Sequence, residues 1–316
     1  MCTGVRFVDD KGNMYFGRNL DWSTNYGQHV VITPSGYKPN SPFNAIQTIA
    51  HPVIGMAIVV ENTPLYFDAA NDKGLAVAGL NFPGYACYEK EPQEGKTNIA
   101  AYEFPLWVTA NFESVDEVEE ALQNAAIVDK PINPQFASSQ LHFIIGDKNR
   151  SIVVEYTKAG MQIFHDDFDV LTNQPGFDYH RENVRNYINV APIMPEYVMW
   201  GKAKLVPFGS GSEMRGLPGD CYSPSRFVRV AYTNAMYPTQ TDEASNVSRL
   251  FHTLSSVAMI DGGATMIDGN FERTLYTGGY SAATKTYYFN TYENFAISSV
   301  AMGDYDTASE ELIEVK

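Results

Sequence analysis

The chain of 316 residues contains only three cysteines, Cys2, Cys87 and Cys221, and no CxxC pair. An odd and sparse count excludes the disulfide framework of a small secreted domain. Six histidines are present, but none has the spacing of a metal site. The glycine-rich segments 208–220 and 262–269 lack the GK[ST] ending of a phosphate-binding loop, and we interpret both as ordinary loops. The sequence therefore predicts neither a metal nor a cofactor.

Long apolar runs and basic residues are also scarce. No stretch approaches the roughly 18 uncharged apolar residues of a membrane span, and the start lacks the basic-then-apolar pattern of an export signal. We therefore expect no membrane span and a reducing cytosolic location. The net charge of −15 argues against a nucleic-acid partner, because binding requires cations that neutralise phosphates. The overall negative field also repels anions, so an anionic substrate would have to be attracted by arginines close to the site.

The composition, with 44% hydrophobic residues, allows a sizeable core, and no linker or repeat divides the chain. Strand-like runs gather at both ends and in the middle, at 3–8, 14–20, 29–33, 53–60, 64–69, 74–80, 141–146, 151–156, 160–164, 273–280, 284–291 and 294–301. Helical patterns lie between them, at 98–111 with an interruption near Pro105, 114–126, 225–236 and 242–259. This order predicts a single α+β layered domain rather than strict βαβ alternation.

The first 22 residues predict a β-hairpin around the turn-rich segment DDKGN. Its pairing places residue i opposite residue 22−i or 23−i, so Cys2 faces Leu20 or Asp21 and Arg18 lies near Gly4. Residues opposite each other in such a pair have Cβ atoms about 4.5–5.5 Å apart. A cysteine, an aspartate and an arginine are therefore expected to converge at the open end of the hairpin.

If Met1 is removed, Cys2 carries both a thiol and a free α-amine, so that one residue can supply a nucleophile and its base. An α-amine has a pKa of about 7.7–8.0 and can serve as the base for its own thiol. A nearby Arg18 favours the thiolate, and Asp21 can hold the amine in position, as the acid of a triad orients its base. The alternative interpretation is an ordinary cysteine beside a surface ion pair.

Several blocks of the sequence resemble the choloylglycine hydrolase family of N-terminal-nucleophile hydrolases, particularly its bile salt hydrolases of bifidobacterial type. They are MCTGVRF, YFGRNLDW, GLAVAGLNFPGY, YEFPLWV, DVLTNQPGFDYH, LPGDCYSPSRFVR and NTYENFAI, and they span essentially the whole chain. The resemblance implies an αββα sandwich of two antiparallel sheets flanked by helices. It also implies one domain over residues 2–316 after Met1 removal, a homotetramer and a bacterial cytoplasmic location.

The resemblance further implies a role for six residues. These are Cys2 as nucleophile, Arg18 beside the thiol, Asp21 holding the α-amine, Asn81 facing the scissile carbonyl, Asn173 as the amide of the oxyanion hole and Arg226 as the second arginine. Taken alone, Asn81 and Asn173 are typical turn residues, and Arg226 is typical of a solvated or ion-paired side chain. Cys87 and Cys221 match no site of the family.

The implied substrates are conjugated bile salts, which need an apolar cleft and donors for an anionic group. By resemblance, loops 22–26, 58–67 and 127–138 line the cleft, and Cys2, Arg18 and Asn81 bind the substrate together with six candidate contacts. These contacts are Trp22, Tyr26, Leu65, Phe67, Ile132 and Phe136. Some of these side chains could equally belong to the core. Asparagine at position 81 favours bile salts, whereas penicillin V acylases of the family tend to carry tyrosine there. The alternatives are a penicillin V acylase or other acyl-amide hydrolase, and a silent binding protein or unprocessed precursor.

Overall fold

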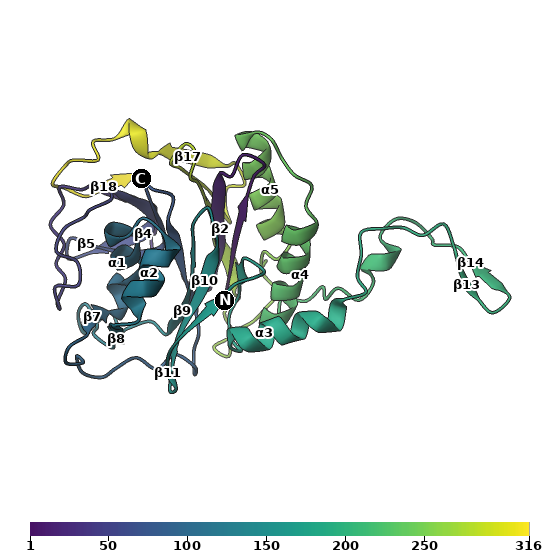
Figure 1. The fold of residues 1–316 in the computed structure, drawn as a ribbon, viewed down its shortest axis with the longest axis horizontal. Helices are drawn as coiled ribbons and strands as arrows, with labels where there is room; N and C mark the ends of the chain where they lie inside the picture. Colours follow the sequence, from purple (N-terminus) through teal and green to yellow (C-terminus); the bar gives the residue numbers. More distant parts are fainter. Residues whose placement is uncertain (316) are drawn as a thin grey trace.

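Two antiparallel sheets lie face to face in the computed structural model, which describes residues 1–315 (Figure 1). One sheet has six strands in the order β12-β1-β2-β15-β16-β17, and the other has eight in the order β11-β10-β9-β6-β5-β4-β3-β18. The strands of the first are β1 (Cys2–Val8), β2 (Met14–Trp22), β12 (Val170–Leu171), β15 (Arg273–Ser281), β16 (Thr286–Thr291) and β17 (Ser298–Ala301). Those of the second are β3 (His29–Thr33), β4 (Val53–Val60), β5 (Thr63–Asn71), β6 (Ala76–Asn81), β9 (Leu141–Gly146), β10 (Ser151–Thr157), β11 (Gly160–His165) and β18 (Ile313–Val315).

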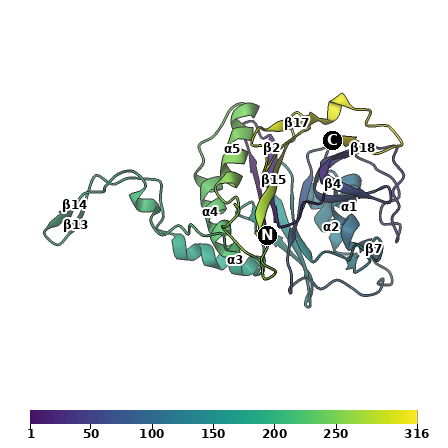
Figure 2. The same ribbon diagram turned by 180° about the vertical axis from the view of Figure 1, so that it is seen from behind.

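Helices cover the outer face of each sheet (Figures 1 and 2). The eight-stranded sheet is covered by α1 (Phe104–Asn111) and α2 (Val115–Leu122), and the six-stranded sheet by α4 (Ser223–Met236) and α5 (Glu243–Ser255). A further helix, α3 (Phe177–Val184), packs on α4. Apolar side chains fill the space between the layers, so that the central strands of each sheet are buried on both faces. The expected αββα sandwich is therefore confirmed.

The first hairpin has the predicted register, with Cys2 opposite Leu20 and Gly4 opposite Arg18. Alternation along β2 sends its side chains to both faces of the sheet. Arg18 reaches carbonyl groups of the eight-stranded sheet, whereas the Asn19 side chain donates to the Leu254 carbonyl of α5. The open end of this hairpin can therefore be contacted from between the sheets and from the helix layer.

Two β-bulges lie beside this open end. The pairing of β2 with β15 shifts between Thr274 and Tyr276, which leaves Thr274 opposite Asp21. The pairing of β4 with β5 shifts so that Phe67 has no direct partner. Bulges bend a strand and redirect its side chains and carbonyl groups, and both bulges here adjoin the predicted functional residues.

The expected helix over 98–111 is wrong in its first part. Residues Thr97–Ala100 form strand β7, which pairs in parallel with β8 (Ala125–Val128). Pro105 does not interrupt α1 but lies in its first turn, where the missing N–H costs no hydrogen bond. The strand β8 also ends the predicted helix 114–126 early, at Leu122.

Other boundaries differ at element ends. The helix expected to reach residue 259 ends at Ser255, and the strand expected from 294 begins at Ser298, because Asn294 belongs to a turn. The sequence interpretation missed β12, α3, β18 and an arm over residues 188–222 that projects from the sandwich (Figure 1). The arm carries a small hairpin of β13 (Val198–Trp200) and β14 (Ala203–Leu205). Short 3-10 turns complete the elements at Ala101–Glu103, Arg185–Tyr187, Ser212–Met214 and Met302–Asp304.

Across residues 1–315, none of the helices combines the length and apolar character needed to cross a bilayer. The same residues contain no group of three or more His, Cys, Asp or Glu side chains that could hold a metal ion.

Candidate active site

Cys2 lies at the open end of the first hairpin and is 97% shielded from solvent. Its backbone N–H donates to Asn173 Oδ1 at 2.7 Å, and its carbonyl accepts from Arg226 Nη1 at 2.5 Å. The neighbouring Met1 carbonyl accepts from the Asp21 N–H at 2.8 Å. The first two residues are therefore held by three segments distant in sequence.

Asn173 connects several members of the site. Its Oδ1 accepts a second hydrogen bond from Arg226 Nη2 at 2.7 Å, and its Nδ2 donates to the Asn81 carbonyl at 2.8 Å. Its own backbone is fixed as well, because its N–H donates to Ser223 Oγ at 2.9 Å and its carbonyl lies 2.8 Å from His180 Nε2. The orientation of this amide is thus determined by the groups around it, of which Cys2, His180, Ser223 and Arg226 are themselves buried.

Arg226 is buried completely in the first turn of α4. In addition to Cys2 and Asn173 it donates to Thr3 Oγ1 at 2.6 Å and to the Cys221 carbonyl at 2.9 Å, and its Nη1 lies 4.0 Å from Asp21 Oδ2. Burial lowers the pKa of Arg226, against the negative charge of Asp21. Its hydrogen bonds compensate for the loss of water around the guanidinium.

Arg18 is also fully buried, and it lies between the two sheets. Nη1 donates to the carbonyls of Phe67 at 2.9 Å and Gly79 at 2.8 Å, and Nε to that of Asn19 at 3.3 Å. Burial works against the cation, but the negative charges around it, with Cys2 first among them, outweigh burial and raise the pKa of Arg18. Nη2 has no hydrogen-bond partner in the described residues.

Asp21 offers one free carboxylate oxygen beside the start of the chain. Oδ1 accepts from Thr274 Oγ1 at 2.6 Å, whereas Oδ2 is buried and has no hydrogen-bond partner among residues 1–315. The terminal ammonium, which belongs to Met1 here, donates to the Asp21 carbonyl at 2.5 Å and pairs with the Glu272 carboxylate. Burial lowers the pKa of this ammonium, opposed by the charges of Cys2 and Asp21.

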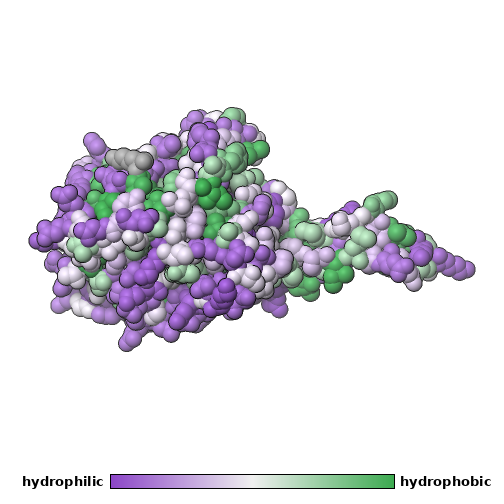
Figure 3. All heavy atoms as spheres, turned by 90° about the horizontal axis from the view of Figure 1, so that it is seen from above, coloured by the Kyte–Doolittle hydropathy of each residue, from purple (hydrophilic) through white to green (hydrophobic). Residues whose placement is uncertain are grey.

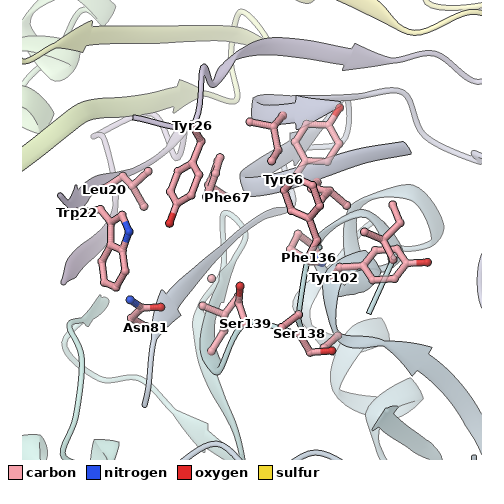
Figure 4. A pocket seen from close by; sticks show the side chains of 18 of the residues that line it. Leu20, Trp22, Tyr26, Tyr66, Phe67, Asn81, Tyr102, Phe136, Ser138 and Ser139 are labelled. Atoms are coloured by element: carbon pink, nitrogen blue, oxygen red, sulfur yellow. The ribbon is translucent and has the colours of Figure 1, made fainter. Parts of the chain in front are cut away.

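A cavity opens directly above Cys2 and encloses about 1000 Å³, including the part open to solvent. Its wall contains all six aromatic and aliphatic contacts predicted for the cleft, as well as Asp21 and Asn81. Figure 4 labels five of these residues, Trp22, Tyr26, Phe67, Asn81 and Phe136. Arg18, which we expected to bind substrate, is not part of that wall, and neither are Asn173 and Arg226. All three instead donate hydrogen bonds to backbone carbonyls of lining residues. Tyr26 and Phe136 remain 44% and 37% exposed, so the cavity keeps an apolar surface in contact with water.

Some lining residues lie outside the three loops predicted for the cleft. They are Leu20, Gly79, Ala101, Tyr102, Pro105, Ser139 and Leu141, whereas Ile58, Tyr66, Pro131, Ala137 and Ser138 belong to the predicted loops 58–67 and 127–138. Tyr102 belongs to the block YEFPLWV, which the resemblance included without assigning it to the cleft. Thr274, which contacts Asp21, lies in a strand rich in threonine and tyrosine, and such a composition indicates only a strand.

Known proteins are similar to this one along its whole length. The sequence model described as linear amide C–N hydrolases, choloylglycine hydrolase family, matches residues 2–315. A bile salt hydrolase/transferase of Bifidobacterium longum subsp. longum is 60% identical over 316 residues, covering 100% of this chain and 99% of that protein. A conjugated bile acid hydrolase of Lactobacillus gasseri is 46% identical over 314 residues, covering 99% of each.

Solved structures give the same result for the fold. A variant of the conjugated bile acid hydrolase of Clostridium perfringens superposes with a TM-score of 0.93 at 37% identity, covering 100% of this chain and 97% of that one. A penicillin V acylase of Agrobacterium tumefaciens superposes with a TM-score of 0.77 at 18% identity, covering 98% and 90%. The second similarity extends to the fold alone.

Proposed function

Because the chain belongs to the choloylglycine hydrolase family of linear amide C–N hydrolases, we propose that it hydrolyses glycine- and taurine-conjugated bile salts to the free bile acid and the amino acid. The observation that carries this proposal is the position of Cys2 at an apolar cavity, next to a buried Asp21 oxygen that has no hydrogen-bond partner among residues 1–315. The relatives named for bile salt and conjugated bile acid hydrolysis cover the full chain and support the substrate class.

Removal of Met1 is the first requirement, and the mature domain then begins at Cys2. The Met1 amine already lies in a buried position that lowers its pKa, close to Asp21. After removal, the α-amine is that of Cys2, whose nitrogen lies 2.7 Å from Asn173 Oδ1. A neutral α-amine at this position can accept the thiol proton, while Asp21 Oδ2 accepts a hydrogen bond from the resulting ammonium.

The Cys2 thiolate then attacks the carbonyl carbon of the amide, and the electron pair of the C=O bond moves to oxygen. The Asn81 backbone N–H and the Asn173 side-chain amide stabilise this oxyanion, in agreement with their direct contact. When the tetrahedral intermediate collapses, the C–N bond breaks and the ammonium of Cys2 protonates the leaving amine. Water, deprotonated by the same amine, attacks the thioester and releases the bile acid and the thiol.

The cavity wall suits a large apolar acyl group. Trp22, Tyr26, Leu65, Phe67, Ile132 and Phe136 present aromatic and aliphatic surface around it. The buried cations Arg18 and Arg226 supply positive charge next to the reaction centre. They thereby counteract locally the net charge of −15, which otherwise repels an anionic conjugate.

The arm of residues 188–222 supports a second part of the proposal, a homotetramer. None of its residues is buried, and Trp200 is 74% exposed. Figure 3 shows hydrophobic residues along the arm among hydrophilic ones. A segment without a core of its own cannot compensate for its ordering entropy within one chain, and exposed apolar residues of this kind mark association sites. We therefore propose that the arms of several copies pack on one another.

The proposed location is the bacterial cytoplasm. Cys2, Cys87 and Cys221 are all free thiols, and free thiols persist in a reducing compartment. Fractionation of producing cells tests this, since hydrolase activity recovered outside the cytosolic fraction would contradict it.

The function is tested with the purified protein and three substrates, glycocholate, taurocholate and penicillin V, by quantifying the released amine or acid. Intact mass first establishes that Met1 is absent. We expect the bile salts to turn over far faster than penicillin V, and Cys2→Ala to be inactive. The matched control is Cys87→Ala, an exposed cysteine outside the site, which should retain full activity. Equal turnover by the Cys2→Ala protein would refute the mechanism, and preference for penicillin V would refute the substrate class.

A further inference from the structure

Asp68 lies on β5 and is almost completely buried, at 4% exposure. Both of its carboxylate oxygens accept hydrogen bonds from tyrosines of the opposite sheet. Tyr276 donates to Oδ1 at 2.5 Å and Tyr287 to Oδ2 at 2.6 Å. Two hydroxyl donors on two acceptor oxygens are the pattern expected for an ionised carboxylate.

We call Asp68, Tyr276 and Tyr287 the Asp68 cluster. The backbone next to these side chains leaves room for them. Gly278 pairs with Arg18 in the sheet, and a Cβ atom at Gly278 would lie 2.1 Å from the Tyr287 hydroxyl. Only glycine therefore lets this tyrosine reach Asp68. The bulge on the other sheet leaves the Phe67 carbonyl without a direct strand partner, and that carbonyl accepts from Arg18.

Charge balance links the Asp68 cluster to Arg18. The acceptors that bind the buried guanidinium are neutral carbonyls, so its charge must be compensated by groups at longer range. The charged or titratable groups around it are Cys2 on β1, Asp21 on β2, Asp68 on β5, Tyr276 on β15, Tyr287 on β16, and the terminal amine. Asp68 is one of two carboxylates among these groups, and two tyrosine hydroxyls fix its position.

We propose that Asp68 is a positioning residue for amide hydrolysis, which balances the Arg18 cation and so limits how strongly that cation acts on the Cys2 sulfur. This inference rests on the proposed role of Cys2 as the nucleophile. Burial raises the pKa of Asp68, against the Arg18 charge and the two tyrosine hydroxyls, so the group needs these partners to stay ionised.

The role has a specific consequence for reactivity. Without the Asp68 charge, the uncompensated guanidinium favours the thiolate more strongly, so the thiolate forms at lower pH. A thiolate stabilised in this way is a weaker nucleophile, because nucleophilicity falls as the thiol becomes more acidic. A purely structural role would reduce the amount of folded enzyme but leave the pH at which Cys2 becomes reactive unchanged.

The test uses Asp68→Asn, which keeps the shape of the side chain and removes its charge. Two pH profiles are measured on protein lacking Met1, the rate of Cys2 alkylation by iodoacetamide and kcat/KM for glycocholate. We expect the acid limb of both to move to lower pH by about one pH unit, and kcat/KM on the plateau to fall severalfold. Tyr287→Phe should move both in the same direction by less, because it weakens the ionised state without removing it.

The matched control is Asp166→Asn, another buried aspartate, which lies in the β11–β12 connection and has Asp169 as its charged neighbour. It should leave both profiles in place. An unmoved acid limb in folded Asp68→Asn protein overturns the inference, and if that variant does not fold, an unmoved limb in Tyr287→Phe does so. The proposed function fails separately, if alkylation of wild-type Cys2 leaves bile salt turnover intact.

Discussion

Asn173 Oδ1 accepts a hydrogen bond from the Cys2 backbone nitrogen at 2.7 Å, across 171 residues of sequence. The same amide donates to the Asn81 carbonyl and accepts from Arg226. One side chain thus joins the start of the chain, the second sheet and the helix layer. In the proposed mechanism the oxygen of this planar amide binds the α-amine of Cys2, and its nitrogen donates to the oxyanion. The two contacts therefore cannot change independently of each other.

Replacing Asn173 by alanine should therefore reduce kcat for glycocholate by a factor of about 10²–10³, the usual cost of losing one oxyanion donor. The loss should lie mainly in kcat, because the negative charge that this amide stabilises develops only in the transition state. Steady-state kinetics with Met1-free protein measures this. The control is Asn186→Ala, an exposed asparagine after α3, which should behave like wild type. A change confined to KM would contradict the assigned role.

A second prediction concerns Thr274, whose hydroxyl donates to Asp21 Oδ1 at 2.6 Å. Thr274→Val keeps the shape but leaves a buried carboxylate oxygen without its donor and the Met259 N–H, 2.8 Å from the same hydroxyl, without its acceptor. We expect a loss of about 1.5–3 kcal/mol in the free energy of unfolding, as for a hydrogen bond to a charged group. We also expect at least a tenfold decrease in kcat, because Asp21 no longer has a fixed orientation. Urea unfolding and bile salt turnover measure the two effects.

Thr277→Val is a matched control for this prediction. Thr277 lies on the same strand, is equally buried, and donates to Asn19 Oδ1 at 2.7 Å. It should cost about 1 kcal/mol of stability, as for a neutral hydrogen bond, with little change in kcat. If the two variants lose activity in proportion to stability, Thr274 has no special relation to the reaction.

The hairpin that carries Cys2, Arg18 and Asp21 could be predicted because its register depends on local information. The turn residues and the period of two fix which residues are opposite. The strand β7 could not be predicted in the same way. The segment Thr97–Ala100 forms a strand through its parallel pairing with β8, a partner distant in sequence that leaves no periodic pattern.

The same distinction applies to the site. The predicted cleft residues lie together in one cavity, but their positions came from the resemblance and not from periodicity. Thr274 and Asp68 were missed because each acquires its role through a bulge or a contact between sheets. A bulge inserts a single residue, which no composition or spacing rule detects in one sequence.

The arm gives a third prediction. Replacing Trp200 and Phe208 together by serine should reduce the assembly to smaller species, because both side chains are exposed on a segment without a core. Light scattering coupled to size exclusion measures the mass. Lys202→Ser, at the tip of the same hairpin, should leave the mass unchanged. A wild-type protein that is already monomeric at micromolar concentration would contradict the proposed tetramer.

The last prediction follows from His180, which is fully buried with Nε2 2.8 Å from the Asn173 carbonyl and its ring stacked on Phe227. Burial lowers the pKa of His180 from 6.5 to about 4. The folded state therefore favours the neutral ring, and the associated stability is fully present above pH 6.5. It decreases as the pH falls from 6.5 towards 4, because the unfolded chain then binds a proton that the folded chain does not.

At pH 5 this single group should reduce the free energy of unfolding by about 2 kcal/mol relative to pH 7, since each pH unit between the two pKa values is worth about 1.4 kcal/mol. His180→Gln should remove that share of the pH dependence, because glutamine can still donate to the Asn173 carbonyl but does not titrate. Urea unfolding at pH 7 and pH 5 provides the comparison, with His252→Gln on the exposed face of α5 as the control. Equal losses between pH 7 and pH 5 in wild type and His180→Gln would show that the buried ring is not the group whose protonation weakens the fold.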